Sequence, residues 1–396
     1  MAVKIVRQPN KIALLGAPTS AAAMSAGHEG APAALRSAGL VERLRSVGYE
    51  VSDLGDDPPQ LSKPDDESPR ARNLRRVIAA LEALKPRVEQ AVKSAALPII
   101  LSGDCSVALA TVAGARRYFR NVSMIYMDRD ADLNTPATTP SGCVDGMVVS
   151  HLTGTGAAEM VRFWGEPPLV REPDLALFGV ARLDPAEEQL LTKSPLRCFH
   201  ASDVQRMGAA AAAQAAVERI HANGYEFILH FDVDVIADFQ ATNYPGAGGL
   251  SLEEVREALD VFATQKHLAA IEVTAYNPTK DADASAAKLI IELLSGVLAK
   301  RLEALKAAAQ TAPAHVVASV ASTAQSGAAF PEKETSANTM PSPANAAAVP
   351  PPVAAGEAWS SDSLETESAS DSENPEPDSH EPSGESSGEQ EESPSS

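Results

Sequence analysis

Short apolar runs alternate with longer amphipathic stretches along residues 1–309, and this alternation limits the possible folds more than any other feature. The apolar runs are near-continuous, as expected for strands covered on both faces of a sheet. They lie at 12–17, 50–54, 98–102, 122–128, 174–180, 196–200, 226–232 and 268–273. Helical patterns lie at 31–47, 68–96, 105–117, 207–222 and 251–266, with a closing helix at 283–308. The alternation predicts one α/β domain with a mostly parallel sheet.

Residues 310–396 have a different composition, rich in Ala, Pro, Ser and Glu with few branched apolar side chains. Such a segment buries too little surface to offset its chain entropy, so we expect a disordered acidic tail after a domain at 1–309. Of the net charge of −20, residues 357–392 contribute −13 and residues 310–355 contribute −1, which leaves −6 for the domain. The domain has no basic stripe, and we expect no nucleic-acid partner.

The cysteines and the hydropathy pattern bear on the compartment. Cys105, Cys143 and Cys198 are odd in number and well separated, so they predict no disulfide framework. No apolar run approaches the roughly 18 residues that a membrane helix needs, and no targeting signal precedes the first predicted strand. We expect a soluble, cytoplasmic protein with no membrane partner.

Potential metal ligands gather at the predicted strand ends. In open α/β sheets, ligands bind beyond the carboxyl ends of the strands, which brings the segments at 103–106, 128–145 and 232–249 together. Alternation along a strand puts His230, Asp232 and Asp234 on one face. The full set of side chains is Cys105, Asp128, Asp130, Asp132, His230, Asp232 and Asp234.

Aspartates packed this densely need a divalent cation or must share protons. A single Asp-x-Asp is also typical of a loop turn or a helix cap. Two such clusters at neighbouring strand ends favour the metal site.

Several motifs in a fixed order resemble a known family. "SGDCS", "DRDADLNTP", "TPSG", "HFDVD" and "IEV", together with "LLGAPTSAAAMSAGHEGAPAALRSAGL" and "TAYNPTKD", resemble the ureohydrolases: arginase, agmatinase, formimidoylglutamase and relatives. The resemblance covers residues 12–305, and "DLNTP" and "TTPSG" are most similar to the arginase branch. It implies a three-layer α-β-α domain with an eight-stranded sheet and hydrolysis of a linear guanidine or amidine. Arginine, cleaved to ornithine and urea, is the default substrate. A homotrimer or homohexamer is implied as well.

The resemblance also implies two Mn²⁺ ions with a hydroxide between them that attacks the guanidinium carbon. Carried over by position, the first ion is held by Cys105, Asp128, Asp132 and Asp232. The second is held by Asp128, Asp130, Asp232 and Asp234.

The chain departs from the family pattern at three histidine positions, which are Cys105, Asp130 and Asp145 here. Five carboxylates and a thiolate place a charge of −6 against the +4 of two divalent ions. Thiolate also shifts the metal preference toward Zn²⁺ or Fe²⁺. As a hypothesis, His230 replaces the missing nitrogen ligand; the alternative is that it hydrogen-bonds a ligating carboxylate.

The catalytic and substrate-binding candidates come from the same resemblance. Glu272 matches the acid that pairs with the guanidinium, and Asp145 is either a general acid/base or a turn residue before Gly146. The substrate-binding candidates are Asn134, Thr139, Ser141, Asp184 and Tyr244, with Arg182 and Cys143 replacing the usual polar neighbours. Loss of the three histidines leaves a second hypothesis open: a non-catalytic metal- or ligand-binding protein whose tail contacts partners.

Overall fold

The computed structural model describes residue 5, residues 7–221 and residues 225–311. The disordered tail predicted from residue 310 onward lies outside the described residues, except for the last two residues of the final helix.

A single eight-stranded sheet carries the described part of the chain. Its order is β2-β1-β3-β8-β7-β4-β5-β6, and every strand pairing is parallel. The eight predicted strands are confirmed, each within two residues at either end. Their bounds are β1 Lys11–Ala17, β2 Glu50–Asp56, β3 Leu97–Ser102, β4 Val122–Met127, β5 Leu175–Val180, β6 Arg197–His200, β7 Glu226–Asp232 and β8 Leu268–Thr274.

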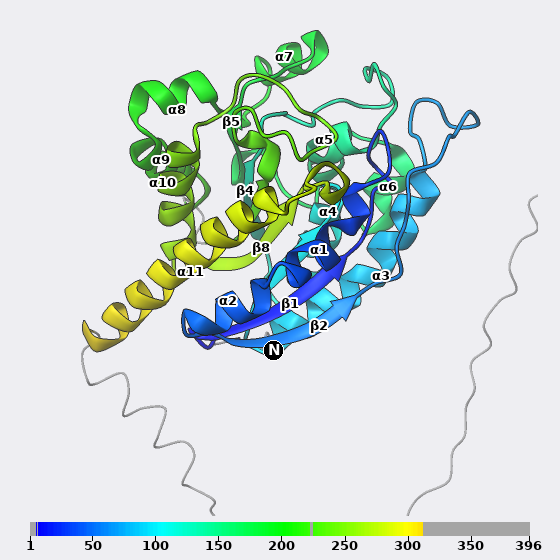
Figure 1. Ribbon diagram of the computed structural model, residues 1–396. Helices are drawn as coiled ribbons and strands as arrows, with labels where there is room; N and C mark the ends of the chain where they lie inside the picture. The colour runs from blue at the N-terminus through cyan, green and yellow to red at the C-terminus, as the bar shows by residue number, and fades with distance from the viewer. Residues whose placement is uncertain (1–4, 6, 222–224, 312–396) are drawn as a thin grey trace, which may run out of the picture. The chain divides into compact units, whose positions relative to one another are not determined.

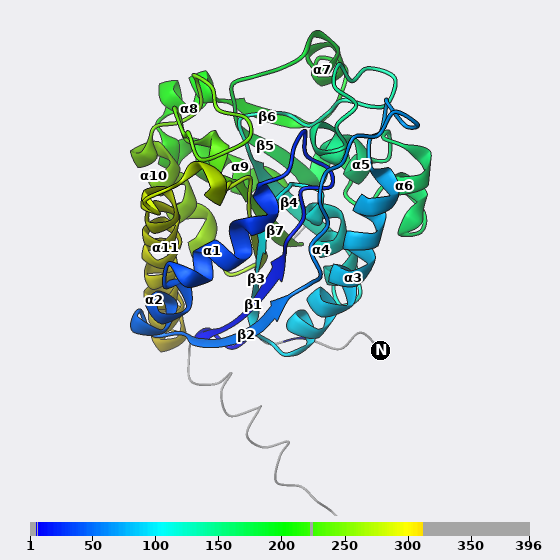
Figure 2. The same ribbon diagram turned by 45° about the vertical axis from the view of Figure 1, so that its right-hand side comes forward.

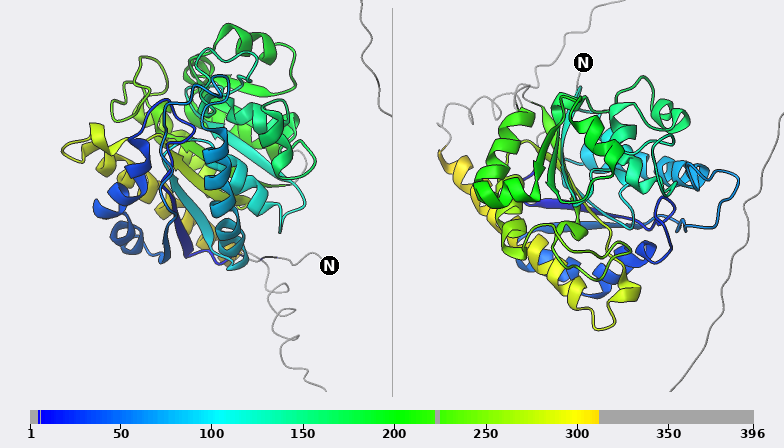
Figure 3. Two further views of the ribbon diagram at one scale, coloured as in Figure 1. Left: turned by 90° about the vertical axis from the view of Figure 1, so that its right-hand side faces the viewer. Right: turned by 90° about the horizontal axis from the view of Figure 1, so that it is seen from above.

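Helices cover both faces of this sheet, which makes the predicted three-layer arrangement (Figure 1, Figure 2). One face carries α1 Ala31–Ser37, α2 Leu40–Ser46, α8 Ala201–Met207, α9 Ala209–His221, α10 Leu252–Thr264 and α11 Ser285–Thr311. The other carries α3 Leu74–Lys93, α4 Val107–Ala115, α5 Val148–Thr153 and α6 Ala158–Phe163. The two layers are visible on either side of the strands in both views of Figure 3. The central strands β3 and β4 are apolar along almost their whole length because both faces are buried. The neighbouring β7 is also buried beyond its first residue, but it carries His230 and Asp232 toward the carboxyl edge.

One predicted helix is divided in two by a glycine. The helix predicted at 31–47 is interrupted at Gly39, whose φ of 94° lies in the left-handed region. The helix predicted at 207–222 corresponds to α9, which begins after Gly208 (φ 84°). The helix α8, which ends before that glycine, was not predicted. The short helices α5, α6 and α7 Pro185–Leu191 were not predicted, because six or seven residues are too few for a clear helical period.

The strand order decides where chemistry can occur. β3, β8, β7 and β4 are consecutive in the middle of the sheet, so the loops after them share one edge. Among the described residues, no helix is long and apolar enough to cross a membrane.

Candidate metal centre

Strand register brings the donor side chains together at the carboxyl edge of the sheet. Met127 of β4 is paired with Phe231 of β7, so Asp128 and Asp232 follow on neighbouring strands. Cys105 comes from the loop after β3, which passes very close to the loop after β1. A Cβ on Gly103 would lie 1.9 Å from the Thr19 carbonyl oxygen, so a glycine is required there.

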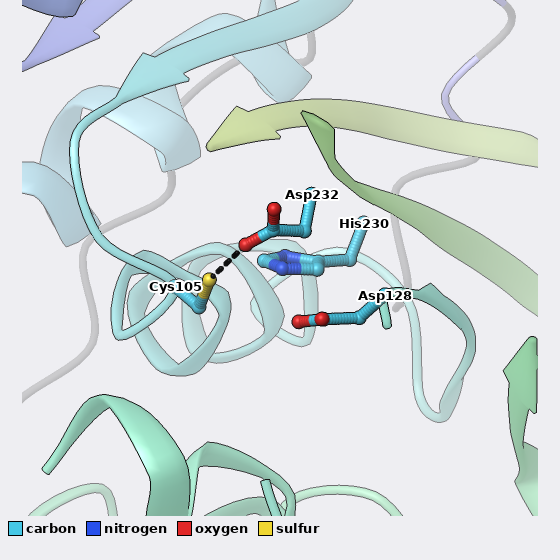
Figure 4. Close-up of side chains that lie close together, drawn as sticks. All are labelled: Cys105, Asp128, His230 and Asp232. Carbon is cyan, nitrogen blue, oxygen red and sulfur yellow. Dashed lines mark hydrogen bonds between the residues drawn. The ribbon is translucent and has the colours of Figure 1, made fainter. Parts of the chain in front are cut away.

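Four donors of mixed chemistry form the first group: Cys105, Asp128, His230 and Asp232. One ligand atom of each lies within 4.8 Å of the others, and all four side chains are buried. In Figure 4 the sulfur of Cys105 faces the carboxylates, and the imidazole lies between Asp128 and Asp232. The Cys105 thiol donates to Oδ2 of Asp232 at 2.9 Å. This sulfur, nitrogen and oxygen set is the size and composition of a transition-metal site.

A second group consists of Asp128, Asp130 and Asp234, with carboxylate oxygens also within 4.8 Å of one another. Two of these carboxylates are paired with arginines. Nε and Nη2 of Arg182 each donate to one oxygen of Asp130 at 2.5 Å, and Nη2 of Arg129 lies 3.3 Å from Oδ2 of Asp234. Oδ1 of Asp234 is buried and has no hydrogen-bonding partner among the described residues.

His230 is held in one orientation. Its Nδ1 lies 2.7 Å from Oε2 of Glu272, and both side chains are 0% exposed. The ring also stacks on Tyr126, with centroids 4.2 Å apart and planes 3° apart. When Nδ1–H donates to the carboxylate, Nε2 carries the lone pair, which is the usual arrangement for a metal-binding histidine. Without a metal ion, this nitrogen lies 3.4 Å from the Thr274 hydroxyl, which is able to donate to it.

Burial dominates the electrostatics of the cluster. Desolvation, followed by the charges of neighbouring aspartates, raises the pKa of Asp128, Asp132 and Asp234 well above the usual carboxyl value. It likewise raises the pKa of the Cys105 thiol. These groups therefore hold protons unless a cation compensates their charge. The orientation of the His230 ring and the raised pKa values of Cys105 and Asp128 together fit a bound divalent metal ion at the first group.

A cavity of about 280 Å³ opens beside these groups. Its charged lining is almost wholly acidic: Asp128, Asp130, Asp132, Asp145, Asp184, Glu187, Asp232 and Asp234, with Arg182 as the one cation among the described residues that line it.

Asp145 accepts a hydrogen bond from the Cys105 backbone N–H at 2.8 Å, and the hydroxyl of Tyr244 donates to it at 3.0 Å. Burial, with the charge of Asp104, raises the pKa of Asp145 to about 8.

The substrate-binding candidates lie together in the cavity wall. Asn134 donates to Asp184 at 2.7 Å, and the hydroxyls of Thr139 and Ser141 are 3.4 Å apart. Asp184 also begins α7, where it forms a capping box with Glu187.

Glu272 is placed differently from the expectation. It does not line the cavity, and its carboxylate is fully buried against His230. Pairing with a guanidinium in the cavity would require His230 to move. The contact that the structure shows is with His230, and the substrate contact stays a prediction. The register is the reason, since His230 and Glu272 are directly paired between β7 and β8.

Three functional neighbours were missed from the sequence. Tyr126 donates to Asp132 at 2.5 Å, and its position two residues before Asp128 on the same strand face was the available signal. Glu187 accepts the backbone N–H groups of Leu133 and Asp184, and the spacing "DPAE" of a capping box pointed to it. The pairing of Asp130 with Arg182 had no local signal.

Comparisons with known proteins bear on the family and the fold. The sequence model of the arginase family matches residues 10–299. Arginase from Bacillus subtilis (strain 168) is 28% identical over 292 residues, covering 74% of this chain and 98% of the relative. Arginase from Brevibacillus brevis is 29% identical over 293 residues, again covering 74% of this chain and 98% of the relative. The structure of arginase from Bacillus caldovelox is 27% identical with a TM-score of 0.69, covering 73% of this chain and 98% of that one.

Proposed function

The chain belongs to the arginase family, a family of hydrolases, and we propose that it cleaves a carbon–nitrogen bond of a linear guanidine or amidine with the help of divalent metal. The acidic cavity at the edge of the sheet is the observation that carries this proposal. Eight carboxyl side chains against one arginine make an environment that attracts cations. A guanidinium substrate and a metal ion are both cations.

The residues that would hold the metal are Cys105, Asp128, His230 and Asp232. A divalent ion bound there supplies Lewis acidity and lowers the pKa of a coordinated water, so that a nucleophile is available near neutral pH. Mn²⁺ is the ion expected from the family; the thiol and imidazole donors favour Zn²⁺ or Fe²⁺. Asp130, Asp132 and Asp234 complete the acidic wall around these donors.

Glu272 acts through His230 and does not contact the substrate. By accepting from Nδ1 it keeps the Nε2 lone pair directed at the donor group, and the stacked ring of Tyr126 prevents rotation. This is the role that a carboxylate behind a metal-binding histidine usually has. Glu272 is therefore a positioning residue.

Asp145 is the general acid/base of the proposal. A buried carboxyl with a pKa near 8 exchanges protons in the neutral range, where a proton must reach the departing amine. It is within hydrogen-bonding distance of the Tyr244 hydroxyl, which fixes its orientation.

The other end of the cavity would hold the rest of the substrate. Asn134, Thr139, Ser141 and Asp184 offer hydroxyl, amide and carboxylate groups for an amino-acid backbone. Arginine, hydrolysed to ornithine and urea, is the default substrate on the likeness to arginases. We further propose a cytoplasmic homo-oligomer, a trimer or hexamer, with the small guanidino compound as its partner.

The proposal is tested by urea release from arginine, agmatine and 4-guanidinobutyrate, each with Mn²⁺, Fe²⁺ or Zn²⁺. Asp232→Asn is expected to abolish urea release because it removes a central donor. Asp203→Asn, which breaks an ion pair with Arg206 on an exposed helix, is the matched control and should leave release unchanged. No urea from any substrate with any metal would overturn the proposal.

The burial of Glu272 favours one alternative: a protein that keeps metal or ligand binding without urea release. In that case the cavity has no carboxylate from β8 to orient a guanidinium, and metal binding persists while the urea assay stays blank.

A further inference from the structure

The two groups of donors differ in the cations that already accompany them. In the second group, Asp130 and Asp234 are each paired with an arginine. In the first group, no Lys or Arg of the described residues forms an ion pair with Asp128 or Asp232. The protein itself therefore supplies two positive charges at one position and leaves the other without compensation.

Arg182 satisfies Asp130 completely. Its Nε and Nη2 each take one carboxylate oxygen at 2.5 Å, the two-pronged geometry in which guanidinium binds carboxylate most strongly. The backbones of the two residues also form an isolated parallel bridge, which fixes the pair at the cavity edge. A metal ion at Asp130 would lie beside this guanidinium, and like charges a few ångströms apart repel each other.

Arg129 provides a second fixed positive charge to this group, beside Asp234. It is 2% exposed and donates to both Asp234 and the carbonyl oxygen of Tyr244. Because it stands between Asp128 and Asp130 in the sequence, its backbone belongs to the same strand end as the carboxylates. It cannot withdraw without leaving a buried charge unpaired.

Two departures from the family pattern thus become a single change. Position 130, where the resemblance leads one to expect histidine, has an acid. Position 182, where it leads one to expect an acid, has an arginine. Read separately, each makes the site abnormal, but in space they form one ion pair.

We propose that the guanidinium groups of Arg129 and Arg182 take the place of a second metal ion, so that this chain holds one divalent ion, at Cys105, Asp128, His230 and Asp232. The inference rests on the proposed metal-dependent function and corrects its expected stoichiometry from two ions to one. With sulfur, nitrogen and two oxygens as donors, the site prefers Co²⁺, Zn²⁺ or Fe²⁺ over Mn²⁺.

The experiment counts bound metal. Wild type, Arg182→Gln and the control Arg206→Gln are stripped of metal and dialysed against micromolar Co²⁺, and cobalt per chain is measured by mass spectrometry. Arg182 is 56% exposed on its side chain, so the substitution is expected to leave folding intact, which circular dichroism verifies. Arg206 forms an exposed ion pair with Asp203 away from the cavity.

We expect one cobalt per chain in wild type and in the control. Arg182→Gln should bind a second ion, with affinity raised at least about tenfold over any second binding to wild type, because a nearby positive charge is gone. The cobalt of wild type should show sulfur-to-metal charge-transfer absorption that disappears in Cys105→Ala. Two ions of similar affinity in wild type, no bound ion, or an unchanged count in Arg182→Gln would each overturn the inference.

Metal count and urea release are separate readouts. A wild type with two ions and urea release would overturn the inference and leave the proposed function standing. One ion per chain without urea from any substrate would support the inference and overturn the proposed function.

Discussion

Replacing Asp145 by asparagine should stabilise the metal-free protein, and the gain should depend on pH. Burial raises the pKa of this carboxyl from 3.8 to about 8. A carboxyl whose pKa is higher in the folded state than in the unfolded state takes up a proton on folding at intermediate pH. The cost of ionising this buried carboxyl lowers the free energy of unfolding. This cost is absent below pH 3.8, grows as pH rises, and is complete above pH 8.

The magnitude follows from the width of that window. Each pH unit between the two pKa values contributes about 1.4 kcal/mol, so the penalty is at most about 4 kcal/mol at pH 7 and at most about 2 kcal/mol at pH 5. The charges of Asp104 and Asp232 contribute to the shift, so part of the penalty is shared with them. An asparagine keeps the acceptor for the Cys105 N–H and places its amide toward the Tyr244 hydroxyl.

Urea unfolding of EDTA-treated protein at pH 5 and pH 7, followed by circular dichroism, measures the difference. Asp145→Asn should gain about 2 to 3 kcal/mol more at pH 7 than at pH 5, because only the titrating part of the change varies with pH. Asp66→Asn, at an exposed loop position, is the baseline. The reasoning is refuted if the gain is the same at both pH values or if the variant loses stability as pH rises.

Two further predictions concern stability near the site. Burial lowers the pKa of His151 from 6.5 to about 4, so the stability contributed by the neutral imidazole is present above pH 6.5 and is lost as pH falls toward 4. His151→Leu should therefore abolish about 3 kcal/mol of the pH dependence of the free energy of unfolding between pH 7 and pH 4.5. Urea unfolding measures this, and an unchanged pH dependence would contradict it. Gly103→Ala should destabilise by about 3 kcal/mol or more, since its Cβ would meet the Thr19 carbonyl, whereas Gly146→Ala, whose Cβ meets nothing within 4 Å, should cost about 1 kcal/mol or less in the same thermal unfolding comparison.

The strands could be predicted from the sequence because burial on both faces of a sheet requires near-continuous apolar runs. β3 and β4 are apolar at nearly every position, so their bounds can be found without knowing their neighbours. The acidic residues after β4 and β7 also marked the correct edge. The helix break at Gly39 was harder to predict, because one glycine within a helical pattern is often tolerated.

The charge balance of the site could not be predicted in this way. Arg182 follows β5, and only the adjacency of β4 and β5 in the sheet brings it to Asp130. Nothing local in the sequence connects residues 130 and 182. Glu272 shows the same limit, since alternation along β8 says which residues share a face and not whether that face opens to the cavity.

The pairing of His230 with Glu272 across β7 and β8 has a consequence for how such sites diverge. Both residues lie inside strands, so their backbones are fixed by the hydrogen-bonded ladder and not by a loop. A ligand lost at one strand end can therefore be recovered by a single codon change on an adjacent rung, with no insertion and no remodelling of the chain path. The parallel sheet thus offers a set of fixed backbone positions at its carboxyl edge. Substitutions at these positions can change which side chain supplies a donor atom while the sheet itself stays the same.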